Sequence, residues 1–261
     1  MKLFPFRSPL SQRFPGKHWL RVGLKGVQSL LYPPYCTACA EPTETGKHLC
    51  VDCAEEAERL RWAAPALCRK CSRPFWGSPP LPEICADCLE WNPAFGCVVA
   101  PCRFVGVVRD VVHQFKYDGK RHLRRIVSGW MREGLADARL CHPAPEVLVP
   151  VPLHWWKRRL RGFNQAELLA RELSASDGLE VINALRRVRL TVTQTQLARE
   201  ERRLNVRGAF GMRRRSPRQI EGRHLVLVDD VLTTGATLDA CAAVLLEAGA
   251  ASVRALTAAR G

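Results

Sequence analysis

Four C-x-x-C pairs in the N-terminal third of the chain restrict its fold more than any other feature. Two thiolates three residues apart on a tight turn reach one Zn²⁺ at ~2.3 Å, and two such pairs complete a tetrahedron. We therefore predict a small module over residues 36–93 with two closed, structural zinc sites of four cysteines each. Sequential and interleaved assignments of the pairs both remain open. The predicted ligands are Cys36, Cys39, Cys50, Cys53, Cys68, Cys71, Cys85 and Cys88.

Zinc is also expected to supply most of the folding free energy of this module. A segment of this length with few aliphatic residues cannot bury much of a core by itself. The absence of a secretory signal argues against disulfides among the twelve cysteines. The other four stand singly among apolar residues and are expected to fill the core; they are Cys97, Cys102, Cys141 and Cys241.

Residues 1–35 form a basic leader that is predicted to contain an amphipathic helix near 18–31. Arg21 and Lys25 interrupt its apolar stretch, which excludes a secretory signal. No run in the chain approaches the ~18 apolar residues of a membrane span. We expect a cytoplasmic protein, with a leader that packs on the zinc module or contacts a partner or the inner face of the membrane.

The basic charge of the chain favours a polyanionic ligand. The formal net charge is +15 over 261 residues, which favours nucleic acid, phosphorylated metabolites or acidic lipid. Arginines are concentrated in residues 186–218. A solvated basic surface is the alternative interpretation of the charge alone.

From residue 94 to 261 the pattern changes to alternating strands and helices. This alternation predicts an α/β domain with a mostly parallel sheet and helices on both faces. Strands are expected at 96–104, 146–152, 180–188, 224–228 and 252–258, and helices at 106–119, 122–138, 164–174 and 236–248. Asn164 is expected to cap its helix in a capping box with Glu167.

The stretch LVLVDDVLTTGATL, residues 225–238, predicts a ligand site. A buried strand ends at Val228, and a helix starts at Ala236, so the turn between them offers free backbone N–H groups to a phosphate. Two neighbouring carboxylates suit the hydroxyls of a ribose a few ångströms away. A ribose 5-phosphate meets both requirements, and the absence of Gly-Lys-Thr disfavours a Walker-type loop. The candidate ligand-binding residues are Asp229, Asp230, Thr233, Thr234, Gly235, Ala236 and Thr237.

Two stretches resemble known families. LVLVDDVLTTGAT resembles the phosphoribosyl pyrophosphate (PRPP) motif of type I phosphoribosyltransferases. The second resemblance is to the ComF family, which includes GntX-like proteins. It rests on residues 149–170, VPVPLHWWKRRLRGFNQAELLA, which follow the four C-x-x-C pairs in the chain. The resemblance implies a zinc ribbon joined to a phosphoribosyltransferase fold, in a bacterial protein linked to DNA uptake during natural competence.

The resemblance also implies a reaction. A nucleophile, expected to be nitrogen, attacks C1 of PRPP as pyrophosphate leaves, with Mg²⁺ bridging pyrophosphate and ribose oxygens. Asp229 and Asp230 would orient the ribose, and Arg158 and Arg161, in a pyrophosphate loop at 152–162, would neutralise the leaving group. A flexible loop at 189–210 would close over the ligand, unless its segment 196–204 is simply an exposed helix. Its candidate residues are Arg189, Gln194, Arg199, Arg202, Arg203 and Asn205.

A binding module without catalysis is the competing interpretation. The basic leader, the zinc ribbons and the arginine-rich loop would then hold single-stranded DNA, with PRPP as an effector and a competence helicase as a partner. Trp155, Trp156 and Tyr117 could stack bases. A dedicated leaving-group loop favours the enzyme. The segment 115–125 is expected either to line the acceptor pocket or to end a surface helix; the acceptor and the oligomeric state are open.

Overall fold

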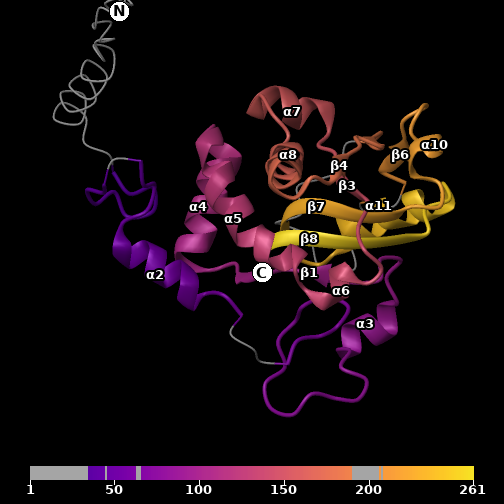
Figure 1. The fold of residues 1–261 in the computed structure, drawn as a ribbon, viewed down its shortest axis with the longest axis horizontal. Helices are drawn as coiled ribbons and strands as arrows, with labels where there is room; N and C mark the ends of the chain where they lie inside the picture. Colours follow the sequence, from indigo (N-terminus) through magenta and orange to yellow (C-terminus); the bar gives the residue numbers. More distant parts are fainter. Residues whose placement is uncertain (1–34, 45, 63–65, 190–205, 207) are drawn as a thin grey trace, which may run out of the picture. The chain divides into compact units, whose positions relative to one another are not determined.

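The computed structural model describes residues 35–44, 46–62, 66–189, 206 and 208–261. The chain divides into two compact units, Met1–Asp52 and Cys53–Gly261, and each is described by itself (Figure 1). The predicted leader helix lies outside the described residues. In the described ranges, no helix has the length and apolar character needed to cross a bilayer.

The described part of the first unit is a cysteine turn followed by a helix start. The N–H of Cys36 donates to the carbonyl of Glu41 at 2.7 Å, and the N–H of Ala40 donates back to Cys36 at 2.9 Å. Ala40 has a φ of +63°, which closes the turn. Tight turns of this kind bring both cysteines of a pair to the same side.

The larger unit is built on a parallel sheet with the strand order β1-β8-β7-β3-β4, in which β2 also pairs with β8. Its strands are β1 (Val98–Val99), β2 (Cys102–Arg103), β3 (Val147–Pro150), β4 (Glu180–Val181), β7 (His224–Leu232) and β8 (Ser252–Arg260). All four residues of β3 are buried, as the continuous apolar run predicts for a central strand. The predicted α/β fold with a parallel sheet is confirmed.

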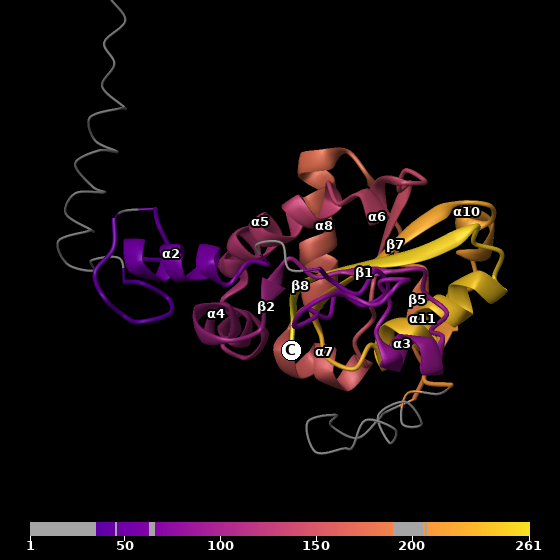
Figure 2. The ribbon, with the colours of Figure 1, turned by 90° about the horizontal axis from the view of Figure 1, so that it is seen from below.

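Helices cover both faces of this sheet. In Figure 2, α5 and α8 lie on one side of β7 and β8, and α11 lies on the other. The α-helices are α2 (Val51–Arg59), α3 (Ala86–Trp91), α4 (Gly106–Tyr117), α5 (Arg124–Leu135), α6 (Ala138–Cys141), α7 (Trp155–Arg161), α8 (Gln165–Asp177), α10 (Pro217–Ile220) and α11 (Ala236–Glu247), and a 3₁₀ turn, η1, spans Arg121–Leu123. The apolar stripe of α4 is fully buried, as its periodicity predicts.

Two of the predicted strands take a different form. The segment 180–188 divides into β4, which joins the sheet, and β5 (Leu185–Arg187), which pairs antiparallel with β6 (Phe210–Met212). The segment 96–104 divides into β1 and β2, both on β8. Pro101 lies between them, and a proline has no N–H to donate to the ladder.

Strand β7 is longer than predicted, and this affects the site. It continues four residues past Val228 to Leu232, because β8 pairs with it as far as Leu232↔Arg260. Asp229 and Asp230 therefore lie within the strand instead of after it. Successive strand residues point to opposite faces of a sheet, so the two side chains leave the strand in different directions, although both line the same cavity at its end.

The predicted capping box at α8 is wrong. The side chain of Asn164 caps no N–H of α8. It is buried, and its Nδ2 donates to the carbonyl of Val151 at 3.0 Å. A buried carbonyl left without a partner costs about 1–3 kcal/mol, at least comparable with the ~1 kcal/mol of a helix cap. Glu167 forms ion pairs with Arg171 at 2.9 Å and Arg158 at 3.6 Å.

The second half of the predicted zinc module belongs to the same compact unit as the sheet. The N–H of Val98 donates to the carbonyl of Lys70 at 2.7 Å, and the hydroxyl of Ser72 donates to the carbonyl of Val98 at 2.7 Å. The guanidinium of Arg260, at the end of β8, donates to the carbonyl of Cys71 at 2.6 Å. The domain limits of 36–93 and 94–261 stay predictions.

Candidate functional site

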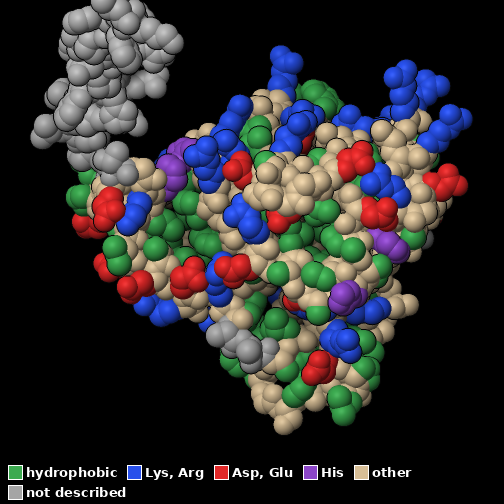
Figure 3. Space-filling model, viewed as in Figure 1, with side chains coloured by type: hydrophobic (Ala, Val, Ile, Leu, Met, Phe, Trp, Pro, Cys, Tyr) green, Lys and Arg blue, Asp and Glu red, His purple; other side chains and the backbone are tan. Residues whose placement is uncertain are grey.

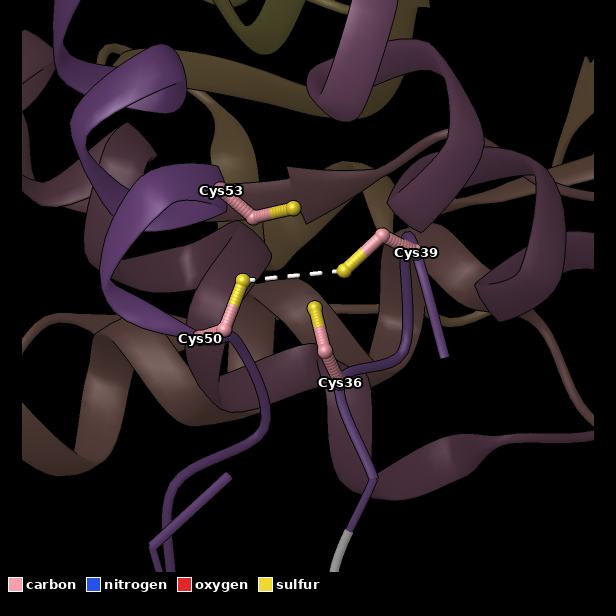
Figure 4. Close-up of side chains that lie close together, drawn as sticks. All are labelled: Cys36, Cys39, Cys50 and Cys53. Atoms are coloured by element: carbon pink, nitrogen blue, oxygen red, sulfur yellow. Dashed lines mark hydrogen bonds between the residues drawn. The ribbon is translucent and has the colours of Figure 1, made fainter. Parts of the chain in front are cut away.

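Eight cysteines form two clusters with metal-binding geometry. In each cluster the four sulfur atoms lie within 4.8 Å of one another: Cys36, Cys39, Cys50 and Cys53 in the first, and Cys68, Cys71, Cys85 and Cys88 in the second. The pairing is therefore sequential, which the spacing alone left open. Figure 4 shows the four thiols of the first cluster pointing toward one another.

The distances between sulfurs fit zinc. A tetrahedron with Zn–S bonds of ~2.3 Å has its sulfurs about 3.8 Å apart. The Sγ atoms of Cys39 and Cys50 are 3.6 Å apart, and those of Cys71 and Cys85 are 3.7 Å apart. With four thiols in each cluster, all ligand positions are filled by protein. These are closed, structural sites that leave no coordination position for a substrate.

In the first cluster, the surroundings lower the pKa of one thiol, that of Cys36. Burial opposes ionisation of Cys36. Hydrogen bonds from the backbone of Cys39, Cys50 and Ala38 outweigh that effect and lower the pKa of the thiol to about 6. Because the thiolate is the ligand form, this favours metal binding at neutral pH.

A cavity of about 390 Å³ lies where β7 leads into α11. One wall is the predicted ligand segment, and the other comes mainly from α4. The segment contributes Asp229, Asp230, Val231, Leu232, Thr233, Thr234, Gly235, Ala236, Thr237 and Leu238, and the opposite wall contributes Phe104, His113, Lys116 and Tyr117. All seven residues predicted to bind the ribose phosphate thus line one cavity.

The turn between β7 and α11 exposes a helix start to this cavity. Gly235 stands at the N-cap position with a φ of +81°, a conformation that other residues rarely adopt. The hydroxyl of Thr234 accepts a hydrogen bond from the N–H of Ala236 at 3.4 Å. Because the N-cap residue is a glycine, it has no side chain to cap this 12-residue helix. Its first N–H groups and its positive end face the cavity, which suits an anion.

Asp230 faces α4 and is held by a lysine. Its Oδ1 lies 2.7 Å from the Nζ of Lys116, and both side chains are largely buried. The same Nζ lies 6.0 Å from the ring centre of Phe104. A buried carboxylate needs such a partner to remain ionised. In the sequence, Lys116 lies within a basic segment, and no local pattern indicates its pairing with Asp230.

Asp229 has the more perturbed carboxyl group. Burial raises its pKa to about 7, and the neighbouring charge of Asp230 adds to the shift, although Lys116 and Arg187 oppose it. Its Oδ1 accepts the N–H of Asp230 at 2.9 Å. A carboxyl group with a pKa near neutrality in a cavity is typical of functional sites. Arg187, on β5, was not among the predicted site residues.

The predicted pyrophosphate loop is largely a helix. Residues 155–161 form α7, which starts after His154, whose Nδ1 accepts the N–H of Trp156 at 3.3 Å. No residue of α7 is buried. In Figure 3, Lys and Arg side chains stand out over the position of α7 in Figure 1.

The two arginines chosen in this segment do not line the cavity. Arg158 pairs with Glu167 at 3.6 Å. The guanidinium of Arg161 stacks 4.6 Å from the ring centre of Tyr117, which itself lines the cavity. Arg161 therefore stands behind the cavity wall.

Only Arg189 of the predicted flexible-loop residues is described. Gln194, Arg199, Arg202, Arg203 and Asn205 lie outside the described residues. The hairpin of β5 and β6 flanks this segment on both sides. Arg187, in β5, connects this segment to the site, because the charge of Arg187 lowers the pKa of Asp229.

These observations define the class of protein: a double zinc ribbon joined to a phosphoribosyltransferase fold. Residues 27–89 match the double zinc ribbon domain, and residues 161–261 match the phosphoribosyl transferase domain. Among solved structures, glutamine PRPP amidotransferase from B. subtilis is similar over 51% of this chain and 26% of that one, at 20% identity and a TM-score of 0.34.

Curated relatives identify the family. Competence protein F of Haemophilus influenzae is 31% identical over 173 residues, which are 65% of this chain and 75% of the relative. DNA utilization protein YhgH of Salmonella typhi is 34% identical over 175 residues, 65% of this chain and 74% of that protein. The chain belongs to the ComF family, as the motifs in its sequence predicted.

Proposed function

We propose that this protein binds PRPP with Mg²⁺ in the cavity between α4 and the β7–α11 turn and transfers the phosphoribosyl group to a nitrogen acceptor. The observation that supports this most is the joint presence of two acids and the start of helix α11 in one cavity of about 390 Å³. A volume of this size suits a small phosphorylated ligand. The proposed link to DNA uptake is supported by relatives that are named a competence protein and a DNA utilization protein.

The turn at 233–237 would bind the 5-phosphate. Gly235 leaves room for the phosphate to approach the backbone, and the first N–H groups of α11 donate to its oxygens. Thr233 and Thr237 would add hydroxyl donors. A phosphate beside a helix N-terminus is favoured by the helix dipole as well as by hydrogen bonds.

Asp230 and Asp229 would accept hydrogen bonds from the ribose hydroxyls. The ion pair with Lys116 keeps Asp230 ionised and fixed. Mg²⁺, when bound with PRPP, would neutralise part of the pyrophosphate charge. Asp229, with its raised pKa, would gain ionisation when such a cation approaches.

In the reaction, the acceptor nitrogen forms a bond to C1 of the ribose as the bond from C1 to the pyrophosphate oxygen breaks. The bonding electrons leave with pyrophosphate, and the proton of the nitrogen passes to water. Arg158 and Arg161 would neutralise the departing charge, and the loop around Arg189 would close over it. The acceptor would lie against the aromatic rings of Phe104, His113 and Tyr117, which line the cavity.

A binding function for single-stranded DNA is the second candidate, and α7 supports it. Trp155 is 64% exposed, Trp156 is 49% exposed and Leu160 is 71% exposed, beside four basic side chains on the same helix. Aromatic rings and arginines together bind single strands by stacking and charge. In this case PRPP would regulate binding instead of serving as a substrate.

The two candidates separate in one experiment. PRPP and Mg²⁺ are titrated into the protein by calorimetry, and pyrophosphate release is then followed in the presence of a low-molecular-weight cell extract. The test variant is Asp229→Asn/Asp230→Asn. The control is Asp110→Asn, an exposed carboxylate of α4 that pairs with Arg109 at 3.2 Å.

The enzyme predicts binding and release in the wild type and in the control, with both lost in the double variant. Binding without release would favour the regulated DNA-binding protein. Failure of the wild-type protein to bind PRPP would refute both uses of the cavity.

A further inference from the structure

The second zinc cluster and the proposed phosphate turn are joined by one short helix, α3. Cys85 precedes this helix, Cys88 lies within it, and Trp91 is its last residue. The helix therefore has two zinc ligands at its start and a large aromatic side chain at its end. All of these residues belong to the unit that contains the sheet.

Trp91 packs directly against the turn. A Cβ atom at Gly235 would lie 3.1 Å from Cη2 and 3.2 Å from Cζ3 of Trp91. Phe95, itself buried, holds the indole from the side in an edge-to-face contact at 5.9 Å. The indole thus supports the back of the glycine whose front faces the cavity.

A second contact fixes the start of α11. The N–H of Ala94 donates to Oδ1 of Asp239 at 2.7 Å. Asp239 lies in the first turn of α11, and its own N–H donates to the carbonyl of Gly235. Residues 91–94 therefore contact both the turn and the helix whose N–H groups would hold the phosphate.

The C-terminal end of α3, next to Trp91, is also held by the zinc ribbon. Nζ of Lys70 donates to Oδ1 of Asn92 at 2.9 Å. The N–H of Asn92 donates to the carbonyl of Cys88 at 3.1 Å, with Asn92 in the left-handed conformation. Lys70 lies between Cys68 and Cys71, so the residue after Trp91 is tied to a cysteine turn of the second cluster.

We propose that Trp91 is a positioning residue for the phosphate-binding turn, and that the second zinc ribbon controls the shape of this turn through it. The inference rests on the proposed function of the turn as a phosphate site. Loss of the indole leaves space behind Gly235, and the backbone N–H groups of the turn lose their alignment. Loss of one hydrogen bond to a charged group lowers affinity about 10- to 100-fold.

The test compares three variants with the wild type. Trp91→Ala removes the support, Trp91→Phe keeps an aromatic ring, and Trp76→Ala is the control, because Trp76 is 88% exposed in the same ribbon. Three quantities are measured: bound zinc per chain, the calorimetric affinity for ribose 5-phosphate, and the amide hydrogen exchange of residues 233–237. Hydrogen exchange needs no ligand and reports the order of the turn directly.

Trp91→Ala is expected to keep two zinc ions, to bind ribose 5-phosphate at least tenfold more weakly and to exchange faster at 233–237. Trp91→Phe should recover part of the affinity, and Trp76→Ala should match the wild type. Unchanged exchange and unchanged affinity in Trp91→Ala would overturn the inference while leaving the proposed function intact. Failure of wild-type protein to bind ribose 5-phosphate or PRPP would instead refute the phosphate site, and the role of Trp91 with it.

Discussion

The substitution Asp229→Asn is expected to stabilise the fold while it damages the site. Burial raises the pKa of Asp229 from the ordinary 3.8 to about 7. Between these two values the native state holds a proton that the unfolded state has lost. The free energy of unfolding therefore falls as pH rises through this window. Asparagine removes the charge and keeps an oxygen to accept the N–H of Asp230.

The size of the effect follows from the shift. One pKa unit corresponds to about 1.36 kcal/mol, so a shift of about three units costs the native state about 4 kcal/mol at pH 8. At pH 5 most native molecules are protonated at Asp229, and the cost is about 2 kcal/mol. The gain in stability of Asp229→Asn over the wild type should therefore be larger at pH 8 than at pH 5 by about 2–3 kcal/mol.

Urea unfolding of both proteins at pH 5 and pH 8, followed by circular dichroism with zinc present, measures this difference. Titration of groups that do not interact with Asp229 contributes equally to both proteins and cancels. Asp110→Asn is the control, since an exposed substitution changes stability by only about 0.5 kcal/mol. A gain that is equal at the two pH values, or larger at pH 5, would refute the argument from the buried charge. PRPP affinity of Asp229→Asn should fall in the same preparations.

Three further outcomes are expected. Lys116→Met removes the partner of Asp230 and a charge that lowers the pKa of Asp229. It should destabilise the protein by about 3 kcal/mol and shift the pH range over which stability falls to higher pH. Chemical unfolding at several pH values measures both effects. Gly235→Ala places a Cβ 3.1 Å from an indole carbon at a φ of +81°. The free energy of unfolding, measured with heat or urea, should fall by about 1–3 kcal/mol. Calorimetry should show weaker binding of ribose 5-phosphate. Cys68→Ser should reduce bound zinc, measured by elemental analysis, from two ions per chain to one, and a wild-type content below two would contradict the assignment of both clusters.

Contiguous features were the ones that the sequence predicted well. The residues predicted in the turn line one cavity, because strand, acids, turn and helix follow one another within 225–238; their binding of a ligand stays a prediction. The eight cysteines were found for the same reason, since each pair lies on one turn. The parallel sheet followed from the alternation of elements, whose periodicities are local properties.

Features that depend on distant segments were missed or mistaken. The sequence did not show that β7 would continue through Asp229, because its length depends on pairing with β8. It also did not show that Lys116 would pair with Asp230, 114 positions away in the chain. The segment 152–162 was expected to be a loop and is mostly α7. This helix is exposed and has no buried residue, so it lacks the buried apolar stripe that would have indicated a helix.

The sequence alone therefore determined which cysteines form the two clusters and which residues are proposed to bind a sugar phosphate, because donors and turns are set within a few residues of one another. Only the tertiary structure decided how the cysteines pair, which face each acid occupies and that Trp91 supports Gly235. The physical reason is that these contacts depend on the order of the strands and on the docking of the second ribbon against the sheet. No local pattern of side chains encodes that arrangement.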